Sequence, residues 1–301
     1  MNIIRYKNEL NESVLAVLTV ENKIYVLPQS DFLSLVREAE NKGKTPLLLI
    51  EEVIENSLPM KLTLNDLDLL KPVDAPEVWA AGVTYENSKL ARNYEASQGY
   101  EEKEETFYDK VYNAARPEIF FKSTSARTVA PRGEVYLRSD SNWQIPEPEL
   151  GLVINKVGKI IGYTIGNDMS CRDIEGENPL YLPQAKVWKN SCSIGPSIRL
   201  AETVEDPYNF DITCRIFRKE EKVFEGSANT EQLKRSYTEL VSYLLKDNEI
   251  FDGTVLLTGT CIVPPNEFTL DHNDRIEIEI EGIGILENTV KKQISQTLPT
   301  L

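Results

Sequence analysis

Residues Ile145–Leu152 read IPEPELGL and place two carboxylates two positions apart in an otherwise apolar run, each directly after a proline. Because a residue that precedes proline is held out of the helical region, Pro148 keeps Glu147 extended. Side chains alternate along a strand, so Glu147 and Glu149 share one face, and Leu150 begins the apolar opposite face. The stretch predicts a buried strand with two acids pointing into one space.

Two buried carboxylates this close would raise the pKa of at least one of them unless a positive charge lies between them. A divalent cation supplies that charge. Carboxylate oxygens suit Mg²⁺, with Mn²⁺ or Ca²⁺ as alternatives, and zinc is disfavoured because no Cys or His is near. On an exposed edge strand the same spacing would instead hold solvated acids.

The best third ligand is Asp168, in the segment GYTIGNDMSCRDIEGEN of residues 162–178. Gly162 and Gly166 permit close passage of the backbone, and Asp168 ends a predicted strand where its side chain can enter a shared cavity. Asp168 therefore joins the two acids of the ExE pattern as a predicted metal ligand.

The chain after Arg116 is rich in strand-like segments. Short or alternating apolar runs with many β-branched residues mark residues 118–123, 133–138, 148–157, 159–170, 193–202, 210–219, 253–265 and 274–290. One predicted helix, over residues 229–248, interrupts them. Many strands with few helices predict an α+β protein built on a sheet-based sandwich or barrel, as opposed to a doubly wound α/β fold.

Pro72 and Pro76 break any regular element and mark a domain boundary. We therefore expect a small mixed N-terminal domain over residues 1–72 and a larger β-rich domain over residues 73–301. The sequence indicates no chemistry for the smaller domain.

The N-terminal domain is predicted to hold short strands, including residues 21–28 and 45–54, around one amphipathic helix. Ser30 or Asp31 would cap the start of this helix, and Gly43 would end it.

Residues Asn87–Ala115 have a helical pattern in which a run of charges alternates with Tyr100, Phe107, Tyr108 and Tyr112. A solvated amphipathic helix or helical hairpin explains this pattern. An alternative hypothesis is a lid that closes over a pocket, because the segment adjoins the acidic motifs in the sequence.

Composition and charge restrict the possible partners. The formal net charge is −15 at pH 7, which opposes binding to nucleic acid or anionic lipid and favours small molecules and other proteins. The apolar runs are far shorter than the roughly 20 residues of a membrane span, and the N-terminus lacks the pattern of a secretion signal. We expect a cytoplasmic protein.

The cysteines and the single histidine exclude several kinds of site. The four cysteines are widely spaced, without a CxxC pair, and are expected to be reduced core residues: Cys171, Cys192, Cys214 and Cys261. His272 lies in a turn before a strand, where a solvated role is expected. Catalysis therefore has to depend on carboxylates, lysine, hydroxyls or a metal held by oxygen.

Several motifs resemble those of the fumarylacetoacetate hydrolase family, in the order typical of that family. They are WAAGVTY (79–85), RPEIFFKS (116–123), EPELGLVI (147–154), GYTIGNDMSCRDIEGEN (162–178), LPQAKVWKNSCSIGP (182–196), LLTGTCIVP (256–264) and RIEIEIEGIGILENTV (275–290). The resemblance implies a mixed β-sandwich roll behind a smaller N-terminal domain, assembled as a homodimer or homotetramer.

The resemblance also implies roles for individual residues. Glu147, Glu149 and Asp168 correspond to the family's ligands for Mg²⁺ or Mn²⁺. Lys186 corresponds to a lysine that lines the active site, and Thr260 to a threonine that contacts substrate oxygens.

One departure from the family pattern changes the expected reaction. Hydrolytic members carry a His and a Glu that activate water, at positions that fall here on Ser88 and Ala91. The resemblance is therefore greatest to members that dehydrate 2-keto-3-deoxy-D-arabinonate to 2,5-dioxopentanoate in pentose breakdown, by way of a metal-stabilised enolate. A metal-dependent C–C hydrolase, decarboxylase or isomerase of another 2-oxoacid is the alternative, and a catalytically inert metal-stabilised binding protein is the second alternative.

Dehydration to this product needs two separate proton transfers. We expect Lys186 to act at C3, because a nearby cation would lower the pKa of the lysine toward the working range. Glu118 is expected to act at the C4 to C5 end. Its alternative is a structural role at the start of a strand, paired with Arg116 or Lys122.

Further substrate contacts are predicted from Ser88, Lys122, Gln184 and Thr260. Lys122 could also neutralise the acids, or simply snorkel from a strand toward solvent. Thr260 could simply stabilise a turn, and Gln184 could be a loop residue.

Arg172 is a further predicted substrate contact. With Asp173 it could instead form a buried ion pair, or orient Asp168.

Overall fold

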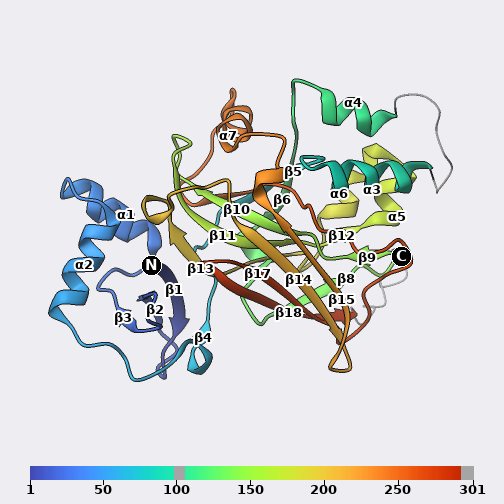
Figure 1. Cartoon of the computed structure of the whole chain (residues 1–301). Coiled ribbons are helices and arrows are strands. Elements are labelled where there is room, and N and C mark those ends of the chain that lie inside the picture. Colours follow the sequence, from blue (N-terminus) through green and yellow to red (C-terminus); the bar gives the residue numbers. More distant parts are fainter. Residues whose placement is uncertain (98–105, 293–301) are drawn as a thin grey trace, which may run out of the picture.

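The computed structural model describes residues 1–97 and 106–292 (Figure 1). The predicted pattern around Tyr100 lies outside the described residues. The described part of the chain forms three β-sheets and seven α-helices. This mixed architecture confirms the predicted α+β class.

The largest sheet contains eleven strands. They are β1 (Asn2–Lys7), β2 (Ser13–Leu18), β3 (Ile24–Val26), β4 (Asp68–Leu69), β5 (Glu77–Gly82), β6 (Glu118–Thr124), β7 (Thr128–Val129), β10 (Pro148–Ile154), β11 (Ile160–Asp168), β13 (Cys192–Leu200) and β16 (Thr254–Leu257). Their order is β3-β2-β1-β13-β11-β10-β16-β5-β6, with β4 paired to β1 and β7 to β13. The predicted acidic strand, β10, thus lies in the middle of the sheet.

Two smaller sheets complete the β structure. Their strands are β8 (Glu134–Leu137), β9 (Gln144–Ile145), β12 (Ser170–Cys171), β14 (Asp211–Arg218), β15 (Glu221–Asn229), β17 (Arg275–Ile280) and β18 (Gly284–Lys292). A five-stranded sheet has the order β15-β14-β17-β18-β8, and β9 pairs with β12.

The helices lie at the periphery of the sheets (Figure 1). They are α1 (Phe32–Asn41), α2 (Pro46–Asn56), α3 (Glu86–Ser97), α4 (Phe107–Asn113), α5 (Arg172–Glu177), α6 (Leu182–Lys186) and α7 (Tyr237–Leu245). The described ends of the 87–115 segment are therefore helical, as predicted.

Two apolar clusters cover the two faces of β10. Leu150 and Leu152 pack with strands of the five-stranded sheet, including Ile278 of β17. Val153, on the opposite face, packs in a second cluster with Phe32 of α1 and Leu257 of β16. This alternation is the one predicted for β10, and it holds the acidic end of the strand between two cores.

The N-terminal strands continue the main sheet. β1 pairs antiparallel with β13, so that Ile3 lies opposite Ile198. The domain boundary predicted near residue 72 stays a prediction.

The prediction of a strand over residues 45–54 is wrong, because these residues form the start of α2. The side chain of Thr45 caps the helix by accepting a hydrogen bond from the Leu48 N–H at 3.3 Å, and Pro46 occupies the first turn. A short apolar run fits a strand or a buried helix equally well, and here the Thr-Pro start decides for the helix.

Other local predictions have clear outcomes. Asp31 caps α1, and its side chain accepts from the Ser34 N–H at 2.8 Å. The helix predicted over residues 229–248 is shorter: Ser236 caps it, and it begins at Tyr237. His272 is exposed in a turn before β17, as predicted.

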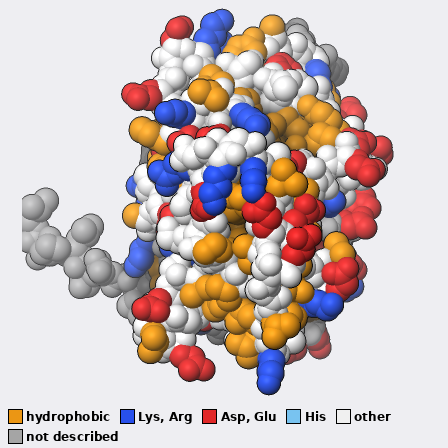
Figure 2. Space-filling model, turned by 90° about the vertical axis from the view of Figure 1, so that its left-hand side faces the viewer, with side chains coloured by type: hydrophobic (Ala, Val, Ile, Leu, Met, Phe, Trp, Pro, Cys, Tyr) orange, Lys and Arg blue, Asp and Glu red, His pale blue; other side chains and the backbone are white. Residues whose placement is uncertain are grey.

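The cysteines lie in the core, as predicted. All four cysteines are buried and free. On the face that carries α1 and α2, Lys and Arg side chains are interspersed with Asp and Glu (Figure 2). None of the helices in the described part of the chain is long and apolar enough to cross a membrane.

Replacing Thr45 by Ala should lower the urea midpoint of unfolding by an amount equivalent to about 1 kcal/mol, because α2 loses its cap. Thr45→Ser keeps the hydroxyl and should unfold close to the wild type. An Ala variant as stable as the Ser variant would show that the cap does not stabilise α2.

Candidate active site

Glu147, Glu149 and Asp168 converge where β10 and β11 meet. Glu147 directly precedes β10, Glu149 lies within it opposite Gly166, and Asp168 ends β11. The Asp168 N–H donates to the carbonyl of Glu147 at 3.0 Å, which fixes the two backbones together. One carboxylate oxygen from each residue lies within 4.8 Å of the other two. The predicted convergence of the three acids is confirmed.

The surroundings of Glu149 show the electrostatic strain of this convergence. Burial, and then the charges of Asp168 and Glu147, raise the pKa of Glu149 well above its usual range. One oxygen of Glu149 accepts from the Gly259 N–H at 2.6 Å. Gly259 has a φ of +99°, and a Cβ there would lie 1.9 Å from the Thr84 hydroxyl, so only glycine can present its N–H in this way.

Two buried lysines partly compensate the acids. The ammonium of Lys122 lies 2.5 Å from Asp168 and donates to the carbonyl of Met169 at 2.8 Å. Lys186 forms an ion pair with Glu147 and lies 3.8 Å from Asp168. Lys122 therefore pairs with an acid of the site, as one of its predicted alternatives had it, and its contact with substrate stays a prediction.

The charges around Lys186 raise its pKa in the absence of a metal ion. Burial alone would lower the pKa, but the charges of Asp168, Glu147 and Glu175 outweigh burial and raise it. The lowered pKa expected for a base at C3 concerned a lysine beside a bound cation, and it stays a prediction. Asp168, Glu147 and Glu175 thus favour the charged form of Lys186.

The charges around the three acids fit a dication. Glu118 and Glu175 bring the buried or half-buried carboxylates to five, against three cations, Lys122, Lys186 and Arg92. Two negative charges remain when all eight groups are ionised, and a divalent ion would balance them and so favour the ionised carboxylates. One oxygen of Asp168 is paired with Lys122. The other accepts no hydrogen bond from the described residues and is available as a ligand. A site of carboxylate oxygens alone suits magnesium.

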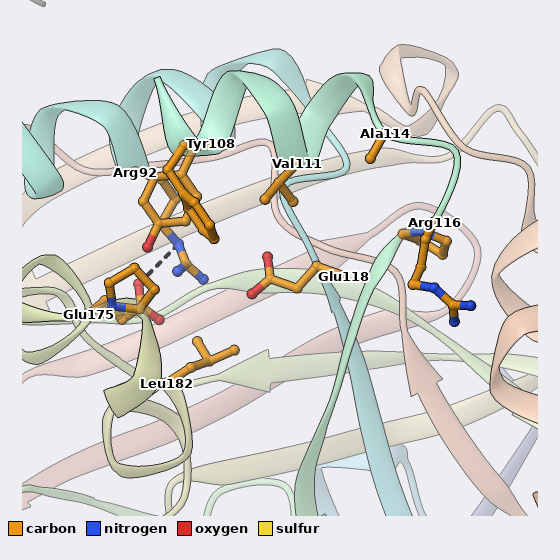
Figure 3. A pocket seen from close by; sticks show the side chains of 11 residues that line it. Arg92, Tyr108, Val111, Ala114, Arg116, Glu118, Glu175 and Leu182 are labelled. Carbon is orange, nitrogen blue, oxygen red and sulfur yellow. Dashed lines mark ion pairs between the residues drawn. The ribbon is translucent and has the colours of Figure 1, made fainter. Parts of the chain in front are cut away.

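A cavity of about 360 Å³ lies beneath α3 and α4 (Figure 3). The three acids do not line it, but Glu175, which contacts Lys186, does. The walls of the cavity combine apolar side chains, among them Val111 and Leu182, with the charged groups of Arg92, Glu118 and Glu175. Whether α3 and α4 move as a lid stays a prediction.

Glu118 projects into this cavity from the start of β6 (Figure 3). Burial raises the pKa of its carboxyl, and this effect outweighs the opposing charge of Arg92. One of its oxygens is buried and accepts no hydrogen bond from the described residues. The raised pKa favours the protonated form of the Glu118 carboxyl that faces the cavity.

Of three further residues predicted to contact substrate, two bond to nearby backbone carbonyls and one is exposed to solvent. The Ser88 hydroxyl donates to the Tyr85 carbonyl at 2.7 Å at the start of α3. The Thr260 hydroxyl donates to the carbonyl of Ile262 at 3.1 Å, next to Gly259. Gln184 is exposed on α6. Their contacts with substrate stay predictions.

Arg172 does not make either of the interactions expected with Asp173 and Asp168. Its guanidinium forms an ion pair with Glu95 of α3 and lies 4.3 Å from the centre of the Trp143 ring. Asp173 instead accepts from the Ser141 hydroxyl at 2.6 Å. Both alternatives failed because α3 supplies a nearer partner from a distant part of the chain.

The sequence analysis missed Arg92, Glu95 and Glu175. The buried residues of α3 are Ser88, Arg92 and Glu95, so this helix turns a polar face toward the protein. Their spacing of four and three residues marks one helix face, which was the available signal. We did not interpret this spacing as a buried face, because charged helix faces usually meet solvent.

A family model described as fumarylacetoacetate hydrolase, C-terminal, matches residues 88–291. The chain is 46% identical over 237 residues to 2-dehydro-3-deoxy-D-arabinonate dehydratase of Saccharolobus solfataricus, covering 79% of each protein. It is 50% identical over 242 residues to a probable 2-keto-3-deoxyxylonate dehydratase of Haloferax volcanii, covering 80% of this chain and 81% of that protein.

Solved structures agree with these matches. A 2-keto-3-deoxy-D-arabinonate dehydratase complexed with magnesium and 2,5-dioxopentanoate superimposes with a TM-score of 0.82 at 38% identity, over 98% of this chain and 100% of that chain. Fumarylacetoacetate hydrolase of Exiguobacterium antarcticum gives a TM-score of 0.71 at 21% identity, over 97% of this chain and 100% of that chain, which shows a shared fold alone.

Glu149→Gln should stabilise the metal-free protein at neutral pH. A carboxyl whose pKa is raised by folding opposes the folded state above its unfolded pKa of about 4.3, and the opposition disappears below that pH. The melting temperature should rise at pH 7 by about 2–4 °C per kcal/mol relieved, and match the wild type at pH 4.

The same variant should lose the stabilisation by magnesium that the wild type shows, because one charged ligand is gone. Glu281→Gln removes an exposed carboxylate and serves as the control. An equal rise in melting temperature with magnesium for Glu149→Gln and the wild type would exclude Glu149 as a ligand.

Proposed function

We propose that the chain, which belongs to the fumarylacetoacetate hydrolase family, is a magnesium-dependent hydro-lyase that converts 2-keto-3-deoxy-D-arabinonate to 2,5-dioxopentanoate and water. The convergence of three buried carboxylates, in a chain similar to two sugar-acid dehydratases, carries this proposal.

Glu147, Glu149 and Asp168 would hold the magnesium ion, which supplies Lewis-acid polarisation of the substrate's 2-oxo group and so makes the C3 protons more acidic. The cavity lined by Glu118 and Glu175 is large enough for a five-carbon acid, and its wall is mainly apolar.

We assign proton removal at C3 to Lys186. Its ammonium must first lose its proton, and the raised pKa shows that Glu147, Asp168 and Glu175 oppose this loss. Two of these three carboxylates are the proposed metal ligands. Once they are used as ligands, they stabilise the ammonium less, so the lysine becomes a better base.

Glu118 is suited to the departure of the C4 hydroxyl. Its raised pKa favours the protonated carboxyl, and in that form it can donate a proton to the hydroxyl, which leaves as water while a C3–C4 double bond forms. The resulting carboxylate can then remove a C5 proton. Lys186 returns its proton to C3, and the enol left at C5 gains a proton at C4 as it loses its hydroxyl proton, giving the aldehyde.

Hydrolysis by a His–Glu pair has little support. The hydroxyl of Ser88 is bonded to the backbone of Tyr85, and the single histidine, His272, is exposed in a turn. Decarboxylation or isomerisation of another 2-oxoacid would use the same acids, so product identity has to decide between them.

Assembly and location remain part of the proposal. We propose a homodimer or homotetramer, as the family resemblance implies, and a cytoplasmic location. Four buried, unpaired cysteines suit a reducing compartment.

The direct test is incubation of the magnesium-loaded protein with a panel of 2-keto-3-deoxy sugar acids. The five-carbon substrate should lose the mass of one water molecule and give an aldehyde. A chelator should stop the reaction and added magnesium should restore it. Carbon–carbon cleavage, loss of CO₂ or an unchanged mass would contradict the proposal.

Glu118→Gln and Lys186→Met should separate the two proton transfers. Glu118→Gln cannot donate the proton to the leaving hydroxyl, so dehydration should fall by about 10²–10⁴ while solvent deuterium still enters C3. Lys186→Met should lose both the C3 exchange and the dehydration. Equal exchange in Lys186→Met and wild type, measured by NMR, would remove Lys186 from this role.

A further inference from the structure

Two helices beside the active site are joined by exchanged ion pairs. Arg92 and Glu95 lie one turn apart on α3, and Arg172 and Glu175 lie one turn apart on α5. Arg92 pairs with Glu175 at 3.0 Å, and Arg172 pairs with Glu95. All four side chains are at most 8% exposed. Each helix therefore supplies one cation and one carboxylate to the same buried interface.

The two pairs differ in what lies beyond them. Glu175 uses its second oxygen to contact the ammonium of Lys186, at 3.0 Å. Glu95 has no ion pair with Lys186 or Lys122 among the described residues. The Arg92–Glu175 pair, which Figure 3 shows at the cavity wall, thus continues to the lysine, and the other pair stops at the helix interface.

Lys186 has three carboxylate neighbours in the described structure: Glu147, Asp168 and Glu175. Two of them are proposed ligands of the metal, so their oxygens are directed to the ion when it is bound. Glu175 is the neighbour that can keep its contact with Lys186 in both states. Burial raises the pKa of Glu175, but Arg92 and Lys186 outweigh burial and lower it, so this group stays ionised.

We propose that Glu175 is a positioning residue that holds Lys186 in place when magnesium occupies the three acids, and that Arg92 anchors Glu175 to α3. The catalytic part of this proposal rests on the proposed function, whereas its metal-binding part does not.

Magnesium binding can test the contact without measuring turnover. In Glu175→Gln, the ammonium of Lys186 has only Glu147 and Asp168 as charged partners, so magnesium has to displace it from both. The dissociation constant for magnesium, measured by calorimetry, should rise about tenfold, the factor expected when a charge-assisted contact becomes a neutral one.

Glu95→Gln is the matched control, because it removes a carboxylate from the equivalent ion pair of the same helix interface. It should leave the dissociation constant within about twofold of the wild type. Equal weakening in both variants would assign the effect to a loosened interface and overturn the proposal.

A second pair of variants separates positioning from simple loss of negative charge. In the Lys186→Met background, adding Glu175→Gln should change the magnesium dissociation constant by less than about twofold, since no lysine remains to compete. A tenfold loss that persists in this background would overturn the proposal. This comparison stays informative if Glu95→Gln folds poorly, because it does not use that control.

Exchange of the C3 protons at saturating magnesium then tests the catalytic part. Glu175→Gln and Arg92→Met should both slow this exchange, with a smaller effect on the Michaelis constant, and the double variant should be no slower than the worse single variant. If the wild type itself shows no exchange, the proposed function fails while the magnesium results still judge the positioning role. If the wild type exchanges and both variants match it, the positioning role fails.

Discussion

The mutual repulsion of carboxylates in a dry region is the constraint on which the structure of this site depends. β10 and β11 bring Glu147, Glu149 and Asp168 together between two apolar cores, where water cannot screen their charges. The protein answers with Lys122 and Lys186, which leave the site negative enough to attract a dication but not so negative that the folded state is lost. The same excess of negative charge thus opposes folding and favours binding of the metal ion.

Helix α3, which lies over the cavity, contributes charged side chains to this balance. A surface helix normally turns its apolar side inward, but α3 buries Ser88, Arg92 and Glu95. Through Arg92 and Glu175, the helix reaches the lysine beside the three acids. The sequence pattern of α3 predicts a solvated helix. In the structure, α3 is instead linked to the proposed metal site by a chain of buried ion pairs.

The sequence predicted the parts of the site that depend on local rules. Pro148 and strand alternation placed Glu147 and Glu149 on one face, and the strand end at Asp168 followed from the pattern of β11. Partners that come from distant elements could not be found in this way. The ion pair of Arg172 with Glu95 spans 77 positions of the chain, and no period or motif encodes such a contact. The prediction for residues 45–54 was wrong for another reason. Their apolar run fits either a strand or a helix, and the Thr45 cap favours the helix.

The pairing of β1 with β13 has a consequence for how the chain can be shortened. β13 joins β11, the strand that ends at Asp168, so the N-terminal strands shield an inner strand of the sheet that carries the acids. A protein trimmed at residue 72 would present the N–H and C=O groups of β13 along an open border, and such borders recruit strands from neighbouring molecules. Minimal versions of this protein would therefore need a substitute strand or a disruptive charge at that border to stay dispersed in solution.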